Sequence, residues 1–515
     1  MGATLALALI LMAGTIDAAS LPDKERIDSG RPYKVIRIIP ADDEQLAVMA
    51  SLWQNSSLFD LDFWHGPTRV YAAIDVMVGP KQYDAFQKYL NDHNLYNMVT
   101  IPDVQKLIDS KESRVKSTKA LGNFSRRFQD SFAGTFSISR YHSYAEIQQY
   151  MADLQARFPS RAQVLTIGQT HEGRPIQLLK VGSPVANDAS STKRAFWIDG
   201  GIHAREWIAP STALYFIHQL MIGYDRDPVI RQYVDNIDWY ILPVANPDGY
   251  EYSRSSTYPR VRLWRKNRSP PYCRGHTTNC CQGVDLNRNF DFHWGQIGST
   301  HDPCDEVYAG SSAFSEPETR AIRDFMAERE GRFDGFVTLH SYSQIWMYPY
   351  GHKVRSYPTD VNDLKSVAVI AKRALQSSFG TKYVVGTGAD TLYPASGGSD
   401  DWAKDVAQVK YVFLIELRPE EHIWDGFILD ESQIVPTGKE TWEGVKIVAD
   451  AILQWNGIKP LNRGPAPATK PPGSPTCVDH EARCHWWASF GGCRSWPELL
   501  TQCPKSCRVC DADSM

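Results

Sequence analysis

Residues 199–207 read Asp-Gly-Gly-Ile-His-Ala-Arg-Glu-Trp. The apolar run at residues 195–198 comes directly before them and predicts a buried strand. The Gly-Gly pair predicts a break in the chain, and residues 210–221 are typical of a helix. This order of strand, loop and helix indicates an α/β domain with polar side chains in the loop that follows a strand.

His203 and Glu206 are the two polar residues of this loop that indicate chemistry. Three residues separate them, so a turn between them brings an imidazole nitrogen and a carboxylate oxygen onto one ion, which suits zinc. The spacing alone is weak, because His422 and Asp425 have the same separation. The position after a strand therefore makes His203 and Glu206 the candidate metal ligands.

Six further motifs follow in the chain. They are NPDGY at 246–250, RLWRK at 262–266, GVDLNRN at 283–289, HSY at 340–342, YPASGGS at 393–399 and ELR at 416–418. Together with residues 199–207 they resemble, in order, the secreted zinc metallocarboxypeptidases of the A/B type in their proenzyme form. The resemblance covers about residues 33–456, and a separate one covers about the last forty residues.

The pattern of apolar runs predicts the central domain, residues 128–456. Strands are expected near residues 162, 176, 195, 239, 335 and 410, and long helices at 142–158, 361–379 and 440–455. This alternation argues for an α/β fold with a mixed sheet and helices on both faces. The resemblance implies the eight-stranded-type sheet of the metallocarboxypeptidase fold. Since ligands gather at the carboxyl ends of strands, His203, His340 and Glu416, which each follow an apolar run, should meet there.

The resemblance also implies the catalytic roles. His203, Glu206 and His340 would bind one Zn²⁺, and Asp285 would orient the first histidine through its other ring nitrogen. Glu416 would act as general base on the water that the metal activates, and Arg265 would stabilise the developing oxyanion.

Substrate contacts are implied in the same way. Asn287 and Arg288 would bind the free C-terminal carboxylate, with Arg288 offering a bidentate fork. Tyr393 would close over the substrate, Arg262 and Arg205 would guide it, and Tyr342 would contact the residue before the cleaved bond.

Asp400 decides the expected side-chain preference. An acidic residue at this position of the resembled family favours C-terminal Lys or Arg, because a buried carboxylate needs a cationic guest or polar surroundings. Leu414 is bulky for the wall of such a pocket and is expected to narrow it. A preference for aromatic or aliphatic C-termini therefore stays open as the alternative.

The N-terminal segment predicts export. Residues 1–19 carry a short apolar run followed by small residues, which is typical of a signal peptide, with a buried N-terminal strand or helix as the alternative. No later run is long enough for a membrane span, and a formal net charge of -4 favours neither nucleic acid nor an anionic membrane as a partner. We therefore expect a secreted, extracellular monomer. Sequons lie at Asn55, Asn123 and Asn267, the last with Pro270 close behind it.

Residues 20–127 are expected to form an activation propeptide. The pattern β-α-β-β-α-β over about residues 33–101 is that of a ferredoxin-like α+β unit, and a charged helix should follow at 104–116. The resemblance implies that this unit covers the active-site cleft. The exposed pair Arg126 and Arg127 is a candidate cleavage site for an activating endoprotease.

Cysteine usage agrees with secretion. By the resemblance Cys281 pairs with Cys304, which leaves Cys273 with Cys280, and a Cys-zinc site is the poorer alternative. A Pro-rich linker, residues 457–476, leads to six cysteines within residues 477–510. They resemble a ShK-type domain, which implies the pairs Cys477–Cys510, Cys484–Cys503 and Cys493–Cys507, with an extracellular target for the domain. The Lys-Tyr pair of channel-blocking members is missing, so ion-channel block is not expected.

The sequence thus predicts a zinc-dependent carboxypeptidase made as a zymogen. Two rivals are a catalytically silent binding scaffold and an endoprotease. The complete set of ligands, base and carboxylate anchors opposes the first, and Asn287, Arg288 and Tyr393 oppose the second.

Overall fold

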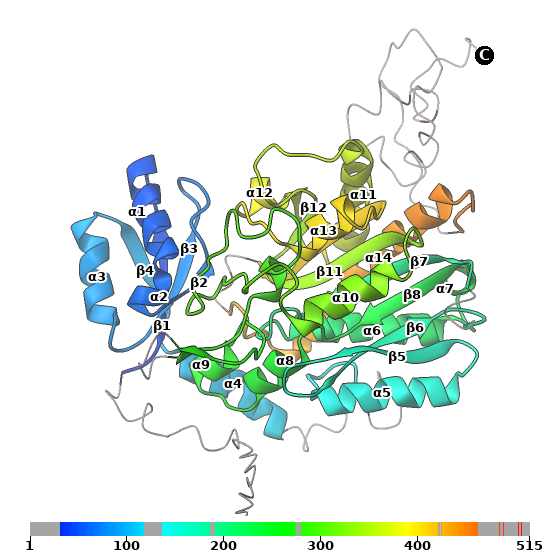
Figure 1. Ribbon diagram of the computed structural model, residues 1–515, viewed down its shortest axis with the longest axis horizontal. Helices are drawn as coiled ribbons and strands as arrows, with labels where there is room; N and C mark the ends of the chain where they lie inside the picture. The colour runs from blue at the N-terminus through cyan, green and yellow to red at the C-terminus, as the bar shows by residue number, and fades with distance from the viewer. Residues whose placement is uncertain are drawn as a thin grey trace, which may run out of the picture.

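The computed structural model describes residues 31–117, 136–185, 191–273, 280–420, 423 and 425–461, together with Cys484, Ala488, Cys503 and Ser506. A small N-terminal domain, residues 33–117, lies against one end of a large domain, residues 136–461 (Figure 1). The expectations for residues 1–19, for Arg126 and Arg127, and for the linker fall outside the described residues.

The N-terminal domain has the expected order of elements. Its antiparallel sheet runs β2-β3-β1-β4, and buried Ile36, Ile38 and Val76 pack against the helices. The elements are β1 (Lys34–Ile39), α1 (Asp43–Gln54), α2 (Ser56–Phe59), β2 (Leu61–His65), β3 (Ile74–Val78), α3 (Tyr83–Asp92) and β4 (Tyr96–Ile101). Residues 59–63 alternate with period two, but β2 starts only at Leu61, because Asp60 takes a left-handed conformation with φ of 55° and ends α2.

The large domain is built on the expected mixed sheet of eight strands, in the order β13-β12-β14-β11-β7-β8-β6-β5. The central strands β14, β11, β7 and β8 are parallel, whereas β6, β5 and β12 each pair antiparallel with a neighbour. The strands are β5 (Ala162–Gln169), β6 (Pro175–Val181), β7 (Arg194–Gly200), β8 (Ile237–Leu242), β11 (Phe333–Ser343), β12 (Ile345–Tyr348), β13 (Val384–Thr387) and β14 (Tyr411–Glu420).

Helices cover both faces of this sheet, as predicted (Figure 1). In β7, Phe196 and Ile198 face one hydrophobic core, and Ala195 and Trp197 face the other, which is the period-two alternation of a strand buried on both sides. The first core contains α5 (Tyr144–Arg157), α6 (Ile208–Gly223), α7 (Pro228–Asn236), α11 (Val361–Phe379) and α14 (Ile434–Trp455); the second contains α10 (Pro317–Ala327) and α13 (Ser399–Asp405).

Shorter elements carry the loops around the sheet. They are α8 (Pro247–Arg254), α9 (Pro259–Arg262), β9 (Tyr272–Cys273), β10 (Cys280–Cys281), η5 (Leu286–Arg288), α12 (Gly388–Thr391) and η6 (Glu431–Gln433). Arg418-Pro419 is a cis peptide, a conformation that costs less before proline than before other residues.

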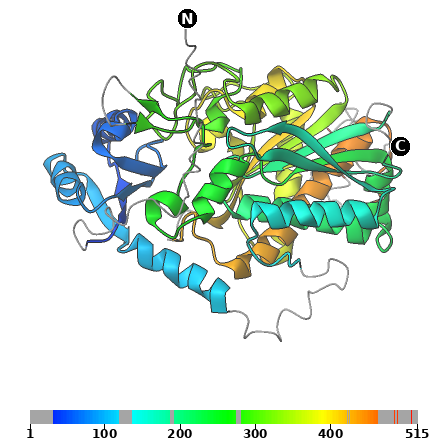
Figure 2. The ribbon, with the colours of Figure 1, turned by 60° about the horizontal axis from the view of Figure 1, so that its bottom comes forward.

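The two domains share a hydrophobic cluster. Trp64, Met77 and Val104 of the N-terminal domain meet Tyr342 and Phe427 of the large domain in it. Helix α4 (Val104–Ser117) then runs along the outside of the large domain beside α9 (Figure 2). The N-terminal domain is therefore packed onto the large domain by its sheet and by this helix.

Three of the predicted disulfides are confirmed: Cys273–Cys280, Cys281–Cys304 and Cys484–Cys503. The pairs Cys477–Cys510 and Cys493–Cys507 lie outside the described residues. In the part of the chain that the structure describes, none of the helices has the length and apolar character that crossing a bilayer requires.

Candidate active site

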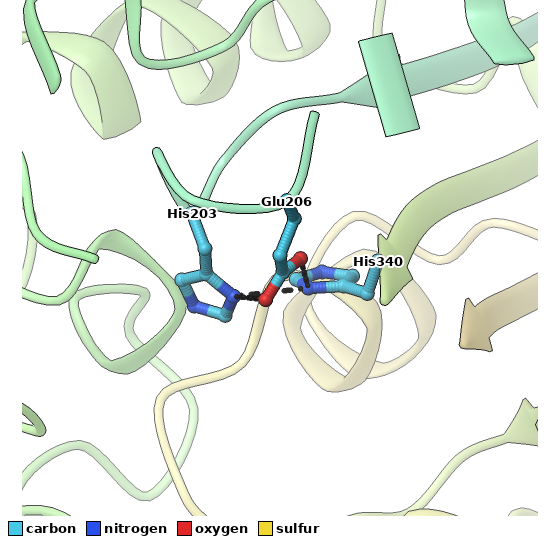
Figure 3. A group of neighbouring side chains, drawn as sticks. All are labelled: His203, Glu206 and His340. Atoms are coloured by element: carbon cyan, nitrogen blue, oxygen red, sulfur yellow. Dashed lines mark hydrogen bonds and ion pairs between the residues drawn. The ribbon is translucent and has the colours of Figure 1, made fainter. Parts of the chain in front are cut away.

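Three side chains converge at the carboxyl end of the central strands: His203, Glu206 and His340 (Figure 3). Nδ1 of His203 lies 2.8 Å from Oε1 of Glu206, and Nδ1 of His340 lies 3.2 Å from Oε2 of Glu206. The three ligand atoms fall within 4.8 Å of one another, and all three residues are buried. The structure therefore brings the predicted metal ligands together.

The loop that carries His203 and Glu206 is held from both sides. Gly201 has φ of 66°, and a Cβ there would lie 2.9 Å from Pro210, so the turn needs a glycine. Asn246 donates from Nδ2 to the carbonyl of Ile202 at 3.2 Å, and the amide of Ala204 donates to the carbonyl of Arg265 at 3.0 Å. The NPDGY and RLWRK motifs thus fix the metal-binding loop.

His340 and Glu416 lie inside their strands rather than after them. The predicted strands ended at residues 339 and 415, but pairing of β11 with β14 continues, and His340 stands opposite Glu416 in the register. The two side chains therefore start from adjacent positions of one parallel pair, which fixes their separation more firmly than two loops would.

The sequence analysis missed the residues that support His340. Nε2 of His340 lies 3.2 Å from Oγ1 of Thr338, whose hydroxyl donates to Oδ1 of Asp199 at 2.7 Å, and Trp197 donates to the other oxygen of Asp199 at 2.7 Å. Burial raises the pKa of Asp199 to about 6. A signal existed in the polar residues Asp199 and Thr338 within otherwise apolar strands, but nothing local shows that they meet.

Asp285 joins the first histidine to Arg265. Oδ1 of Asp285 lies 3.1 Å from Nε2 of His203, while Oδ2 accepts two hydrogen bonds from Arg265, at 3.0 and 2.8 Å. Burial opposes ionisation of Asp285, but Arg265 and His203 outweigh it and hold its pKa well below the usual range. Burial, and then the charge of Arg265, lower the pKa of His203, which keeps its imidazole neutral and able to bind a metal.

Glu416 is half-buried at the wall of the site. Within the described part of the chain, its Oε2 atom is shut off from solvent and has no hydrogen-bond partner. Burial is the main cause that raises the pKa of Glu416 to about 8, and the charge of Glu206 adds to it. An enclosed carboxylate oxygen that lacks a partner and lies beside the three ligands can act as a base, because it is able to accept a proton from a donor that enters the site.

The predicted carboxylate anchors lie together on the opposite wall. Arg288 donates from Nε to the carbonyl of Gly298 at 2.8 Å, and its Nη2 lies 3.5 Å from the hydroxyl of Tyr393. The side-chain oxygen of Asn287 accepts from the amide of Ser399 at 2.9 Å, which ties the 3-10 turn η5 to the start of α13. The guanidinium and the phenol therefore face one space.

That space is a cavity of about 770 Å³, open solvent at its mouth included. The three ligands, Glu416, Arg265, Asn287, Arg288, Tyr342 and Tyr393 all line it. Asp400 lies in its wall at 7% exposure, near the apolar side chains of Met347 and Leu414. Burial, and then the charge of Asp401, raise the pKa of Asp400 to about 7.

Two residues expected to contact substrate, Arg205 as a guide and Tyr342 beside the cleaved bond, are occupied by the N-terminal domain. Arg205 donates from Nη1 to both oxygens of Asp62 at 3.0 Å, and the hydroxyl of Tyr342 lies 3.5 Å from Asp75. Arg262 does not line the cavity: its guanidinium lies 3.4 Å from the ring centre of Trp207, behind Arg205. Arg205 does not line this cavity either, so of the residues expected to contact substrate the structure gathers all but Arg205 and Arg262 around it.

The N-terminal domain also contributes to the cavity wall. Trp64 and His65 line it, and Trp53 packs edge-on against Tyr393 with 5.2 Å between ring centres. The N-terminal domain therefore contacts three of the residues that were expected to bind substrate: Arg205, Tyr342 and Tyr393.

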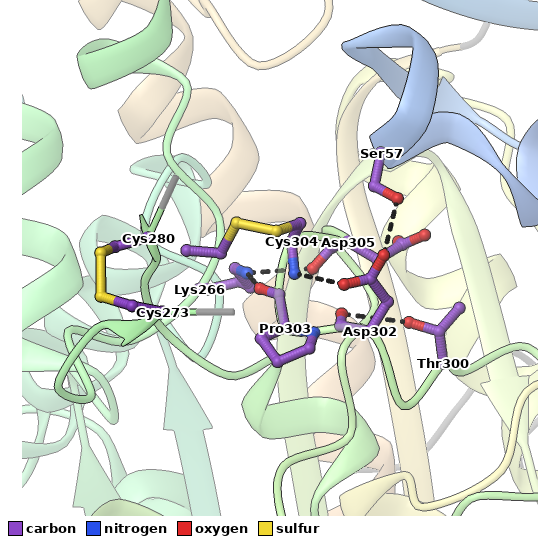
Figure 4. The surroundings of a disulfide bond; sticks show 10 residues. Ser57, Lys266, Cys273, Cys280, Thr300, Asp302, Pro303, Cys304 and Asp305 are labelled. Carbon is purple, nitrogen blue, oxygen red and sulfur yellow. Dashed lines mark hydrogen bonds between the residues drawn. A yellow bond between two sulfur atoms is a disulfide. The ribbon is translucent and has the colours of Figure 1, made fainter. Parts of the chain in front are cut away.

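A disulfide-bonded loop adds a second point of contact (Figure 4). The Cys281–Cys304 bridge precedes Asp305, and Lys266 donates from Nζ to the carbonyls of Pro303 and Asp305 at 2.8 and 3.0 Å. Ser57 of the N-terminal domain donates to Asp302 of this loop at 3.0 Å. The bridge and the lysine thus hold the surface on which α2 rests.

The donor set fits zinc. Two imidazole nitrogens and one carboxylate oxygen are the protein ligands of a catalytic zinc site that keeps a fourth position for water, and Asp285 and Thr338 hold the remaining ring nitrogens.

Comparison with known proteins agrees with this geometry. Residues 147–444 match the model of the zinc carboxypeptidase family, residues 36–111 that of the carboxypeptidase activation peptide, and residues 476–510 that of ShK-like domains. Carboxypeptidase A1 of Bos taurus is 37% identical over 421 residues, which cover 82% of this chain and 94% of that protein. Carboxypeptidase B of Astacus astacus is 43% identical over 312 residues, 61% of this chain and 97% of that protein.

Solved structures give the same result. The structure of thrombin activatable fibrinolysis inhibitor is similar with a TM-score of 0.68 at 31% identity, and covers 82% of this chain and 99% of that one. Carboxypeptidase A from Helicoverpa armigera has a TM-score of 0.72 at 30% identity, with coverage of 82% and 98%.

Proposed function

This chain belongs to the zinc carboxypeptidase family, and we propose that it is a secreted exopeptidase that removes Lys or Arg from peptide C-termini once its N-terminal domain has been cut away. The observation that carries the proposal is a single cavity that contains a zinc ligand set, an unpartnered carboxylate, a buried arginine anchor and a buried acidic side chain. Each part supplies one requirement of the reaction.

The hydrolytic step needs a base and an oxyanion donor. Bound zinc supplies a Lewis acid that polarises the scissile carbonyl and lowers the pKa of water. Glu416 takes the proton of the attacking water as its oxygen adds to the carbonyl carbon, and delivers that proton to the leaving amine as the C–N bond breaks. Arg265, held by two hydrogen bonds to Asp285, donates to the developing oxyanion.

Recognition of a chain end rests on Arg288. Its guanidinium is buried, and a fixed fork can bind both oxygens of a terminal carboxylate. Asn287 adds its amide, and Tyr393 brings its hydroxyl over the substrate from the other side. A carboxylate anchor inside the cavity favours an exopeptidase over an endoprotease.

Side-chain preference depends on Asp400. A carboxylate in a closed wall is costly to ionise, and a Lys or Arg side chain would provide the compensating charge. A second candidate preference, for aromatic or aliphatic ends, is favoured by the apolar side chains of Met347, Leu392 and Leu414 near that carboxylate.

Latency follows from the contacts of the N-terminal domain. Asp62, Trp64 and His65 occupy the approach to the cavity, so we infer that the uncut chain is inactive and that cleavage near Arg126 or Arg127 releases it. We propose boundaries at residues 1–19 for a signal peptide, 20–127 for the propeptide, 128–456 for the enzyme, 457–476 for the linker and 477–510 for the ShK-like module. The module would bind an extracellular target, and the enzyme would act as a monomer.

Hydrolysis of blocked dipeptides tests the proposal. Substrates that end in Arg, Lys, Phe or Leu are compared before and after trypsin, with and without a zinc chelator. Chelator-sensitive release of Arg or Lys only after trypsin supports enzyme, latency and pocket together. Release of Phe or Leu instead supports the second preference, and no release from any substrate supports a silent scaffold.

A matched variant isolates the anchor. Arg288→Lys keeps the charge and loses the fork, so kcat/KM should fall about 100-fold at an unchanged zinc content. Equal loss of zinc and activity would show that Arg288 acts on the fold and not on the substrate.

A further inference from the structure

A second group of metal-binding side chains lies outside the catalytic cavity. His171 stands in the turn between β5 and β6, and Glu316 and Glu318 stand at the start of α10. As in the catalytic group, one ligand atom from each residue falls within 4.8 Å of the others. None of the three lines the cavity that contains the catalytic residues.

The carboxylates of this group are held in place by Asn267. Its Nδ2 donates to Glu316 at 2.8 Å and to Glu318 at 3.0 Å, while its Oδ1 accepts from the amides of Val284 and Ser269. The amide orientation is therefore fixed by the backbone. Asn267 is fully buried, so its sequon is closed to glycosylation in this fold.

One oxygen of the group lacks a partner. Glu318 is 1% exposed, and within the described residues its Oε1 atom has no hydrogen bond, although Oε2 is bonded to Asn267. A buried carboxylate oxygen without a donor costs about 1–3 kcal/mol or more, so it marks a position where a cation or a proton belongs. In the catalytic cavity the same feature occurs at Glu416 beside the other three-ligand group.

The charges of the group also call for a cation. The hydrogen bond to Glu316 raises the pKa of His171, so a metal ion has to displace a proton from this pair; the neutral imidazole and two carboxylates that then bind the ion carry a charge of about −2, which one divalent ion neutralises. Burial, and then the neighbouring carboxylate of Glu316, raise the pKa of Glu318 to about 7, so protons are the competing occupants. Nε2 of His171 lies 3.0 Å from Oε2 of Glu316, close enough either to share a proton with this carboxylate or to bind one metal ion together with it.

We propose that His171, Glu316 and Glu318 bind a second divalent transition-metal ion, with a structural role. One imidazole and two carboxylates suit zinc or manganese, and the partly exposed ring of His171 gives the ion a path from solvent. The ion ties the β5–β6 turn to the start of α10, whose glutamates are bonded to Asn267, two residues after Arg265 in the chain. Its binding stabilises the folded chain by an amount that grows with the logarithm of the free zinc concentration once that concentration exceeds the Kd.

Zinc content of the full-length protein tests this site. After dialysis against buffered zinc, the wild type should contain two equivalents and Glu318→Gln one, with full peptidase activity after trypsin because the catalytic ion stays. Added zinc should raise the Tm of the wild type more than that of the variant. Glu328→Gln, at the exposed end of the same helix, is the matched control and should keep two equivalents.

Three results would overturn the proposal. They are one equivalent in the wild type, two equivalents in Glu318→Gln, and an equal zinc-dependent Tm shift in both proteins. If Glu318→Gln fails to fold, His171→Gln removes the partly exposed ligand instead and should also retain one equivalent. Since activity and zinc content are measured separately, failure here is distinguishable from failure of the catalytic proposal.

Discussion

Replacing Asp400 with Asn should switch the enzyme from basic to apolar C-termini. The carboxyl of Asp400 has its pKa raised from 3.8 to about 7, a difference of about three units that corresponds to roughly 4 kcal/mol against ionisation. A Lys or Arg charge about 4 Å away returns roughly 4 kcal/mol at an effective dielectric constant of about 20. The carboxyl therefore ionises fully when a basic side chain binds.

The amide of Asn cannot ionise, so it offers no charge to a bound Lys or Arg side chain. Loss of a desolvated charge partner costs about 2–4 kcal/mol, so kcat/KM for a dipeptide that ends in Arg should fall about 30- to 1,000-fold. The same value for a dipeptide that ends in Leu should change less than about threefold, because no charge is lost from that complex. The assay is steady-state hydrolysis of both substrates by trypsin-activated enzyme.

The pH dependence follows from the same group. Below its pKa the free carboxyl is neutral and must lose a proton to pair with the guest. For the Arg substrate, kcat/KM should therefore rise as pH increases through about 7 and level off above it. The step near 7 should be missing in Asp400→Asn and for the Leu substrate, which should keep only the rise that comes from ionisation of the base Glu416, whose pKa burial raises to about 8.

A matched control separates the pocket from the helix. Asp405 lies at the exposed end of the same helix α13 and accepts from the hydroxyl of Tyr350 at 2.8 Å, so Asp405→Asn should leave the ratio of Arg to Leu hydrolysis unchanged. An equal loss on both substrates in Asp400→Asn, or a loss under threefold on Arg, would refute the assignment of Asp400 to the substrate pocket.

Three further outcomes are expected. Glu416→Gln removes the base but no zinc ligand, so kcat should fall about 100- to 10,000-fold while elemental analysis finds the catalytic zinc retained; a loss of zinc would assign Glu416 to the metal instead. Asp62→Asn weakens the part-buried pair with Arg205 by about 1.5–3 kcal/mol, so peptidase activity of the uncut chain should rise at least about tenfold; unchanged activity would mean that this pair does not maintain latency. Gly444→Ala adds a Cβ 2.6 Å from Trp346, so it should destabilise the fold by about 1–3 kcal/mol and lower the Tm by several degrees. At an exposed helix position the same substitution would stabilise, so an unchanged or higher Tm would contradict the close packing.

The catalytic set could be predicted because its residues sit in contiguous motifs. His203 and Glu206 share one loop, and Arg265, Asp285 and Glu416 each lie in a distinctive local pattern. The two short strands β12 and β13, of four residues each, were not anticipated, because runs of that length carry too little periodicity to be assigned.

Long-range partners could not be predicted from local pattern. Thr338 supports His340 only because Asp199, 139 residues away in the chain, comes to lie on the neighbouring strand. Likewise Asn267 had the local form of a glycosylation signal, but the fold buries it against two glutamates from α10. Register between distant strands decides such contacts.

The packing of the N-terminal domain on Arg205, Tyr342 and Tyr393 has a consequence for how such an enzyme can change. Under the proposed function, these side chains contact the N-terminal domain before activation and a peptide substrate after it. A substitution that adapts any of these residues to a new peptide therefore also changes how strongly the N-terminal domain inhibits the uncut chain. Laboratory evolution for altered peptide preference should therefore yield uncut chains with raised peptidase activity, unless compensating changes at Asp62, Asp75 or Trp53 arise in the same clones.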